Sequence, residues 1–157
     1  MKRKLIYIII LFASVLLVGC SNKTSPNTKG WKPTQYKVVN NFEQVSMNVI
    51  EDSVSSKELT VIFTNSSNNQ GMYSEDFLLE KKIEGDWYQV PTKRIEFGFN
   101  DIAFELSPST KEVLKINWDW LYGSLDKGEY RIVKTFWAAS TVGDYEEYFL
   151  ASQFIID

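Results

Sequence analysis

The chain has 157 residues, a formal net charge of −3 and a mean hydropathy of −0.21. This mildly acidic balance gives no support to nucleic-acid binding, for which a basic footprint is expected. Histidine is absent and cysteine occurs once, which excludes zinc sites built on those residues and disulfides within the chain. The length suits about one domain, and an aromatic content of 15% supplies large side chains for its core.

The first twenty residues have the organisation of an export signal. Residues 2–4 are Lys-Arg-Lys, and an apolar run follows from Leu5 to Val18. A helix of that run covers about 21 Å, which is too short for a comfortable span of a roughly 30 Å hydrocarbon core. An uncleaved signal anchor is the alternative interpretation, and Gly19 beside Cys20 argues against it.

The residues that end the apolar run, Leu17-Val18-Gly19-Cys20, resemble the lipobox of bacterial lipoprotein precursors. The resemblance implies that the Cys20 thiol receives diacylglycerol and that a peptidase then removes residues 1–19. Two acyl chains hold a protein on a bilayer more firmly than one does. The implied location is the extracellular face of the cell membrane, with the membrane as the partner of Cys20. The mature chain keeps 138 residues and a formal charge of about −6.

Residues 20–34 are polar and are interrupted by prolines and a glycine. Such a segment has little to bury, which predicts a flexible tether before a folded domain of residues 35–157. Trp31 is the one large apolar residue of the tether. The sequence leaves open whether Trp31 docks on the domain or lies at the membrane interface.

Beyond the tether, short segments with strand character recur between turn-forming residues. Apolar and polar residues alternate in them, as in Leu59-Thr60-Val61-Ile62-Phe63, where three apolar side chains share one face. The predicted strands are Val45–Val49, Leu59–Phe63, Phe77–Ile83, Trp87–Val90, Ile102–Leu106, Glu112–Asn117, Tyr130–Trp137 and Tyr145–Ile156. No helical stripe is sustained, although residues 118–125 could make one turn. Seven or eight short strands predict an all-β antiparallel sandwich or barrel.

The segment around Tyr130 favours one kind of sandwich. In Leu125-Asp126-Lys127-Gly128-Glu129-Tyr130-Arg131-Ile132 a tyrosine begins a strand after a glycine turn, two residues before an apolar position. Immunoglobulin-like domains have this pattern at the corner before strand F, where the tyrosine hydroxyl binds upstream backbone. Ile132 then takes the place of the second antibody cysteine, packed against Val61 or Phe63. An unrelated glycine turn is the alternative interpretation.

Taken together, residues 45–156 resemble a family of bacterial immunoglobulin-like domains found in lipoproteins of Gram-positive bacteria. The resemblance rests on three stretches: Leu59 to Asn65, Phe77 to Pro91 and, above all, Trp118-Asp119-Trp120-Leu121-Tyr122-Gly123 leading into Gly128-Glu129-Tyr130-Arg131-Ile132. It implies an immunoglobulin-like β-sandwich of about seven or eight strands. It implies no activity and no catalytic residues.

Trp118, Trp120 and Tyr122 are the candidate binding residues of the chain. If the segment is extended, residues two apart share a face, and the three rings form an apolar strip for a sugar or a partner side chain. The alternative, which we favour, is that at least two of the rings close the end of the sandwich near Tyr130. On that alternative Trp120→Ala should destabilise the fold by about 3 kcal/mol or more.

Carboxylates are the remaining candidates for catalysis, since histidine is absent. Asp144 lies near Glu146 and Glu147, but adjacent residues on a strand point to opposite faces and form no pair by themselves. Asp119 lies between two tryptophans. A solvated surface explains all four carboxylates, and no calcium loop or phosphate-binding glycine motif occurs. We therefore predict that the protein is not an enzyme and uses no metal or cofactor.

Two functions remain open. The first is a membrane-tethered, non-catalytic binding or structural module that contacts a surface protein or a cell-wall component and no nucleic acid. The second is an inhibitor or regulator of an extracellular protease that presents the loop 65–71. The first inference rests on the fold and the second on a loop, and a protease pull-down would separate them. A hydrolase is a third possibility, which the absence of histidine disfavours.

Overall fold

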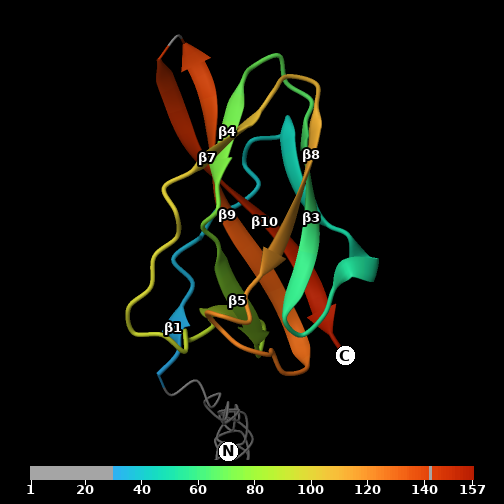
Figure 1. The fold of residues 1–157 in the computed structure, drawn as a ribbon, viewed down its shortest axis with the longest axis vertical. Coiled ribbons are helices and arrows are strands. Elements are labelled where there is room, and N and C mark those ends of the chain that lie inside the picture. The colour runs from blue at the N-terminus through green and yellow to red at the C-terminus, as the bar shows by residue number, and fades with distance from the viewer. Residues whose placement is uncertain (1–29, 142) are drawn as a thin grey trace, which may run out of the picture.

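Two antiparallel sheets packed face to face form the domain in the computed structural model, which describes residues 30–141 and 143–157 (Figure 1). The predicted signal peptide of residues 1–19, Cys20 and the first part of the predicted tether lie outside the described residues. The described part is all β apart from one 3-10 turn, and the prediction of an immunoglobulin-like antiparallel β-sandwich is confirmed. It contains no helix long and apolar enough to cross a membrane.

The smaller sheet has the strand order β2-β3-β8. Its strands are β2 (Val45–Val49), β3 (Glu58–Asn65) and β8 (Lys111–Asn117), and the 3-10 turn η1 (Glu51–Ser53) joins the first two. Alternation determines the inward face of β3, because Leu59, Val61 and Phe63 are fully buried while the residues between them are only partly covered.

The larger sheet is built around one long central strand. Its members are β1 (Lys32–Pro33), β4 (Gly71–Ser74), β5 (Leu78–Ile83), β6 (Asp86–Gln89), β7 (Ala103–Leu106), β9 (Gly128–Thr141) and β10 (Asp144–Ile156). The order is β1-β6-β5-β9-β4-β7, and β10 lies along the other edge of β9 for its whole length. β5 pairs with the first half of β9 and β4 with the second, so both lie on one edge of β9, end to end.

A buried lysine lies where the chain passes from β4 to β5. Lys134 of β9 is almost fully buried, and its Nζ donates hydrogen bonds to the Ser74 and Asp76 carbonyl oxygens at 2.7 and 2.8 Å. These carbonyls belong to the short segment in which the chain leaves the edge of β9, and the lysine provides donors for them. Burial lowers the Lys134 pKa to about 8, although Asp76 and Glu75 act in the opposite direction.

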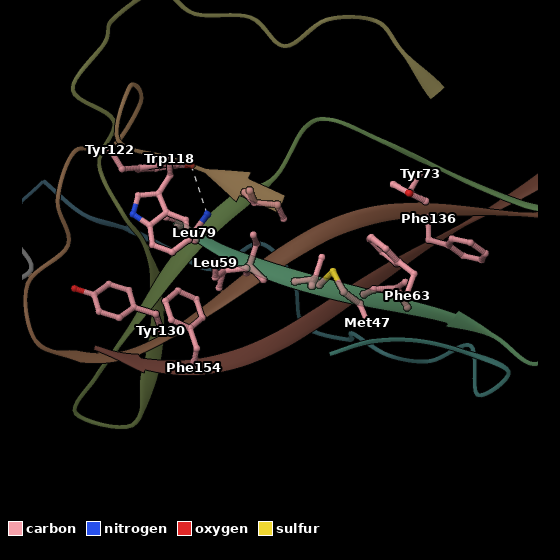
Figure 2. Close-up of a cluster of buried hydrophobic side chains, with 14 of the residues drawn as sticks. Met47, Leu59, Phe63, Tyr73, Leu79, Trp118, Tyr122, Tyr130, Phe136 and Phe154 are labelled. Atoms are coloured by element: carbon pink, nitrogen blue, oxygen red, sulfur yellow. Dashed lines mark hydrogen bonds between the residues drawn. The ribbon is translucent and has the colours of Figure 1, made fainter. Parts of the chain in front are cut away.

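Aromatic side chains fill one end of the core. In Figure 2 the Trp118 ring lies above Phe154, which stacks on Tyr130; the centroid separations are 5.6 and 5.7 Å. The Tyr130 hydroxyl donates a hydrogen bond to the Asp126 carbonyl at 2.8 Å, which is the bond expected for a tyrosine corner. Ile132 is fully buried in the same core as Val61 and Phe63.

The described residues contain ten strands, two more than the upper limit of the prediction. All eight predicted segments form strands; Val45–Val49 keeps both predicted ends, and no end shifts by more than four residues. The additional strands are β1 and β4. Within β4, Gly71 lies against the Phe136 ring, where a side chain would overlap it, so this glycine serves close packing rather than only a turn.

The end of the predicted tether is attached to the larger sheet. Lys32 and Pro33 pair with β6, and the Thr34 amide donates to the Trp87 carbonyl at 2.9 Å. Further along, the Asn40 side chain binds both the amide and the carbonyl of Ala151 on the outer edge of β10. Trp31, left open by the sequence, is half-buried.

Candidate functional site

The three aromatic residues that the sequence singled out do not share one face. Trp118 and Tyr122 are buried, whereas Trp120 is 38% exposed. The reason is local: the Tyr122 amide donates to the Trp118 carbonyl at 2.8 Å, so the segment makes one helical turn instead of an extended strand. The proposed strip of three rings is therefore wrong, and two of the rings belong to the core.

Trp118 and Tyr122 are held in that core by hydrogen bonds as well as by packing. Trp118 Nε1 donates to the Ser56 carbonyl at 3.0 Å. The Tyr122 oxygen accepts a long hydrogen bond of 3.5 Å from the Leu79 amide, drawn as the dashed line in Figure 2. Burial raises the Tyr122 pKa, as it does for a phenol removed from water. The Trp118 ring is therefore closed to a ligand, and only a small part of Tyr122 remains accessible.

Trp120 belongs instead to an exposed cluster that includes the β6–β7 loop. Its ring centroid lies 6.4 Å from Phe97 and 5.6 Å from Phe99, and the Arg94 guanidinium lies 5.7 Å from it. Ile95 is fully exposed and Phe97 is 46% exposed. We call Ile95, Phe97 and Trp120 the apolar patch.

Sequence reasoning missed the loop side of the apolar patch. Ile95, Phe97 and Phe99 alternate with polar or glycine residues, but they lie in a stretch that was assigned to no strand. Large apolar residues in a connecting loop are a signal of a contact surface, because loops are otherwise polar and lie in water. That signal was available in the sequence.

A cavity of about 570 Å³ lies beside the apolar patch, over the outer face of the larger sheet. Phe77, Phe97, Phe99 and Tyr122 line it together with Gly30, the first described residue. The start of the described chain therefore lies next to the β6–β7 loop. Figure 1 shows the same arrangement, with the first part of this loop beside β1.

The candidate carboxylates lie on the surface and are spread over both ends of the domain. Glu146 and Glu147 are exposed on β10, and the Tyr148 hydroxyl donates to Glu146 at 2.7 Å, which raises the Tyr148 pKa. Asp144 is exposed at the start of the same strand. Asp119 pairs with Lys57 at 3.2 Å. In residues 30–141 and 143–157 no group of three His, Cys, Asp or Glu residues is placed to hold a metal ion.

The loop 65–71, considered above as an inhibitory loop, is closed by its own hydrogen bonds. Asn65 and Ser67 are buried. The Asn65 side-chain Nδ2 donates to the Asn69 and Leu106 carbonyls at 2.9 and 3.1 Å, and the Ser67 backbone amide and hydroxyl donate to Asn65 Oδ1. Polar side chains of this loop thus hold its backbone in place.

Comparison with known proteins identifies the domain type. A family model described as a bacterial Ig-like domain matches residues 41–155. No curated protein matches the chain. One similar solved structure is the CsuC-CsuE chaperone-tip adhesion subunit pre-assembly complex from the archaic chaperone-usher Csu pili of Acinetobacter baumannii, with a TM-score of 0.33 and 17% identity over 62% of this chain. The match covers 48% of that chain, so this protein spans about half the length of its structural relative.

Proposed function

We propose that this chain, which belongs to the family of bacterial Ig-like domains, is a lipid-anchored extracellular lipoprotein. Its domain acts by non-covalent contact. The Ig-like fold supports a binding or structural role, but the fold alone does not identify the surface that makes the contact. The observation that carries the role is the apolar patch, in which the exposed Phe97 and Trp120 rings lie 6.4 Å apart and the fully exposed Ile95 lies two residues before Phe97 in the same loop. Exposed apolar clusters with polar neighbours mark interaction surfaces.

The anchor in this proposal rests on the sequence pattern that ends at Cys20. Two acyl chains at that thiol keep the domain on the outer face of the membrane. The contact surface then lies at the end of the domain where the described chain begins, since Gly30 and Phe97 line the same cavity. Of the two functions considered, contact through this surface is the one that an exposed apolar cluster favours.

Site-specific photo-crosslinking on intact cells tests the contact role. A photoreactive residue at Phe97 should form adducts with lipid or with a surface component. The same residue at Val113, an exposed apolar position on β8, provides the matched control and should form few. Equal crosslinking at both positions, or none at Phe97, would show that the apolar patch is not a contact surface.

A further inference from the structure

We propose that the apolar patch docks on the bilayer that holds Cys20, with Ile95, Phe97 and Trp120 at the level of the lipid headgroups. This inference rests on the anchor proposed above and names the partner of the same surface.

The position of the apolar patch relative to Gly30 supports docking. Gly30 shares the lining of one cavity with Phe97 and Phe99. In Figure 1 the β6–β7 loop begins near β1, where the described chain starts, and runs up the side of the molecule toward β7, while the β9–β10 hairpin lies at the end away from β1. A domain attached to a membrane through the residues before Gly30 therefore has the apolar patch on its attached side.

The short distance that the residues between Cys20 and Gly30 can span also supports docking. Ten chain steps separate Cys20 from Gly30, which corresponds to about 17 Å on average for a flexible chain and about 35 Å when fully extended. The attached end of the domain therefore stays within about 35 Å of Cys20. A tether this short gives the apolar patch a high effective concentration at the lipid surface, so weak docking suffices.

The residues that link Cys20 to Gly30 are too polar to cover the apolar patch. Residues 21–29 read Ser-Asn-Lys-Thr-Ser-Pro-Asn-Thr-Lys and contain no large apolar side chain. They have nothing with which to remove Ile95 or Phe97 from water. The acyl chains and headgroup region at Cys20 are the nearest apolar material that the proposed anchor brings.

The residue types of the apolar patch and the charges of the β6–β7 loop support contact with lipid. Tryptophan and tyrosine are enriched at membrane interfaces, where their amphipathic rings sit among headgroups, and Trp120 is the residue of this kind in the patch. Lys93 and Arg94 belong to the β6–β7 loop, but so do Glu96 and Asp101, so the loop has no net formal charge and apolar contact is the attraction. At the far end, Asp144, Glu146 and Glu147 place acidic groups away from the lipid surface.

Quenching of tryptophan fluorescence by brominated lipid tests the docking. The acylated full-length protein, purified from cells in detergent, is reconstituted into phosphatidylcholine vesicles whose acyl chains carry bromine near the headgroup. We expect bromine to quench the parent protein, and W120F to lose most of that quenching. W137F, which alters a tryptophan of the distal β9–β10 hairpin, should lose none.

A charge introduced into the patch provides the second measurement. Ile95→Asp should lower the ratio of docked to undocked domain about tenfold, because an aspartate replaces a side chain that docking removes from water. Val113→Asp introduces the same charge at an exposed position of β8 and should leave the quenching unchanged. Both substitutions are at exposed sites, so the fold is retained.

The results separate docking from anchoring. If acylated protein floats with the vesicles but W120F is quenched as strongly as the parent, docking is wrong and the anchor stands. If the purified protein carries no acyl mass and does not float, the anchor is wrong and the docking falls with it. If Trp120 is not quenched and the detergent-solubilised protein is a dimer that Ile95→Asp dissociates, the patch binds a second copy and the docking is overturned.

Discussion

Arg131 and Glu80 form a buried ion pair across β9 and β5, with Arg131 Nε 2.6 Å from Glu80 Oε2. The guanidinium also lies 4.7 Å from the Trp87 ring and donates hydrogen bonds to Thr34 and Tyr36. One cation therefore joins the central strand to the segment that crosses the outer face of the larger sheet. Glu80 Oε1 is buried without a hydrogen-bond partner among the described residues, so Arg131 is the principal stabilising partner of the carboxylate.

Arg131→Met should destabilise the protein by about 3–5 kcal/mol, because Glu80 is left buried without its counter-charge. The double variant Glu80→Leu/Arg131→Met removes both charges and should cost less than the single change. Urea unfolding of the parent, the two single variants and the double variant gives the coupling free energy between Glu80 and Arg131. Strictly additive costs would show that the two side chains do not depend on each other.

The buried Lys134 predicts an unusual pH dependence. Below pH 8 the folded protein must bury an ammonium. Between pH 8 and 10.5 the folded lysine has lost its proton while the unfolded chain still binds one, so the free energy of unfolding rises with pH. The free energy of unfolding should increase by about 2 kcal/mol between pH 8 and pH 10.

Lys134→Met is the control for this effect, since it removes the titrating group and keeps a long apolar side chain. Its free energy of unfolding should show no comparable rise over the same pH interval. Burial raises the Tyr122 pKa, and that group lowers stability only above its ordinary pKa of 10.0, outside the interval. A parent protein whose stability is flat or falling from pH 8 to pH 10 would contradict the assignment.

The two neighbouring tryptophans should differ strongly when truncated. Trp118→Ala removes a fully buried ring and its hydrogen bond to Ser56, and should cost about 3–5 kcal/mol. Trp120→Ala removes a half-exposed ring and should cost about 1–2 kcal/mol, less than the sequence alone suggested. Thermal unfolding of the two variants checks the order, and a Trp120 variant as unstable as the Trp118 variant would place Trp120 in the core.

Tyr130→Phe tests the tyrosine corner. The substitution keeps the ring against Phe154 and removes only the hydroxyl that binds the Asp126 carbonyl, so it should cost about 1 kcal/mol. Tyr145→Phe, on the exposed start of β10, is the matched control and should change stability by less than about 0.5 kcal/mol. Equal effects of the two substitutions would argue against a stabilising role of the corner.

Much of the fold was predictable because strands with one buried face record their burial in alternation. β3 is the clearest case, since Leu59, Val61 and Phe63 alone define its inward face. The corner at Tyr130 was predictable because a glycine turn, a tyrosine and an apolar residue have fixed spacing there. Both signals are local, and local signals survive in a single sequence.

Other features depend on contacts between distant residues. β4 begins with a glycine that reads as a turn, yet the Phe136 ring occupies the space of its missing side chain. A lysine such as Lys134 is expected to be exposed, but its ammonium donates hydrogen bonds to two backbone carbonyl oxygens where the chain passes from β4 to β5 and is buried there. The direction of Trp120 depends on one helical turn and on the β6–β7 loop packed beside it. No periodicity in the sequence records these contacts.

The most direct test of the central claim is the mass of the N-terminal peptide of the protein purified from its own cells. The account predicts a chain that begins at Cys20 and carries diacylglycerol on the thiol, with residues 1–19 absent. A chain that begins at Met1 and carries no acyl mass would contradict it.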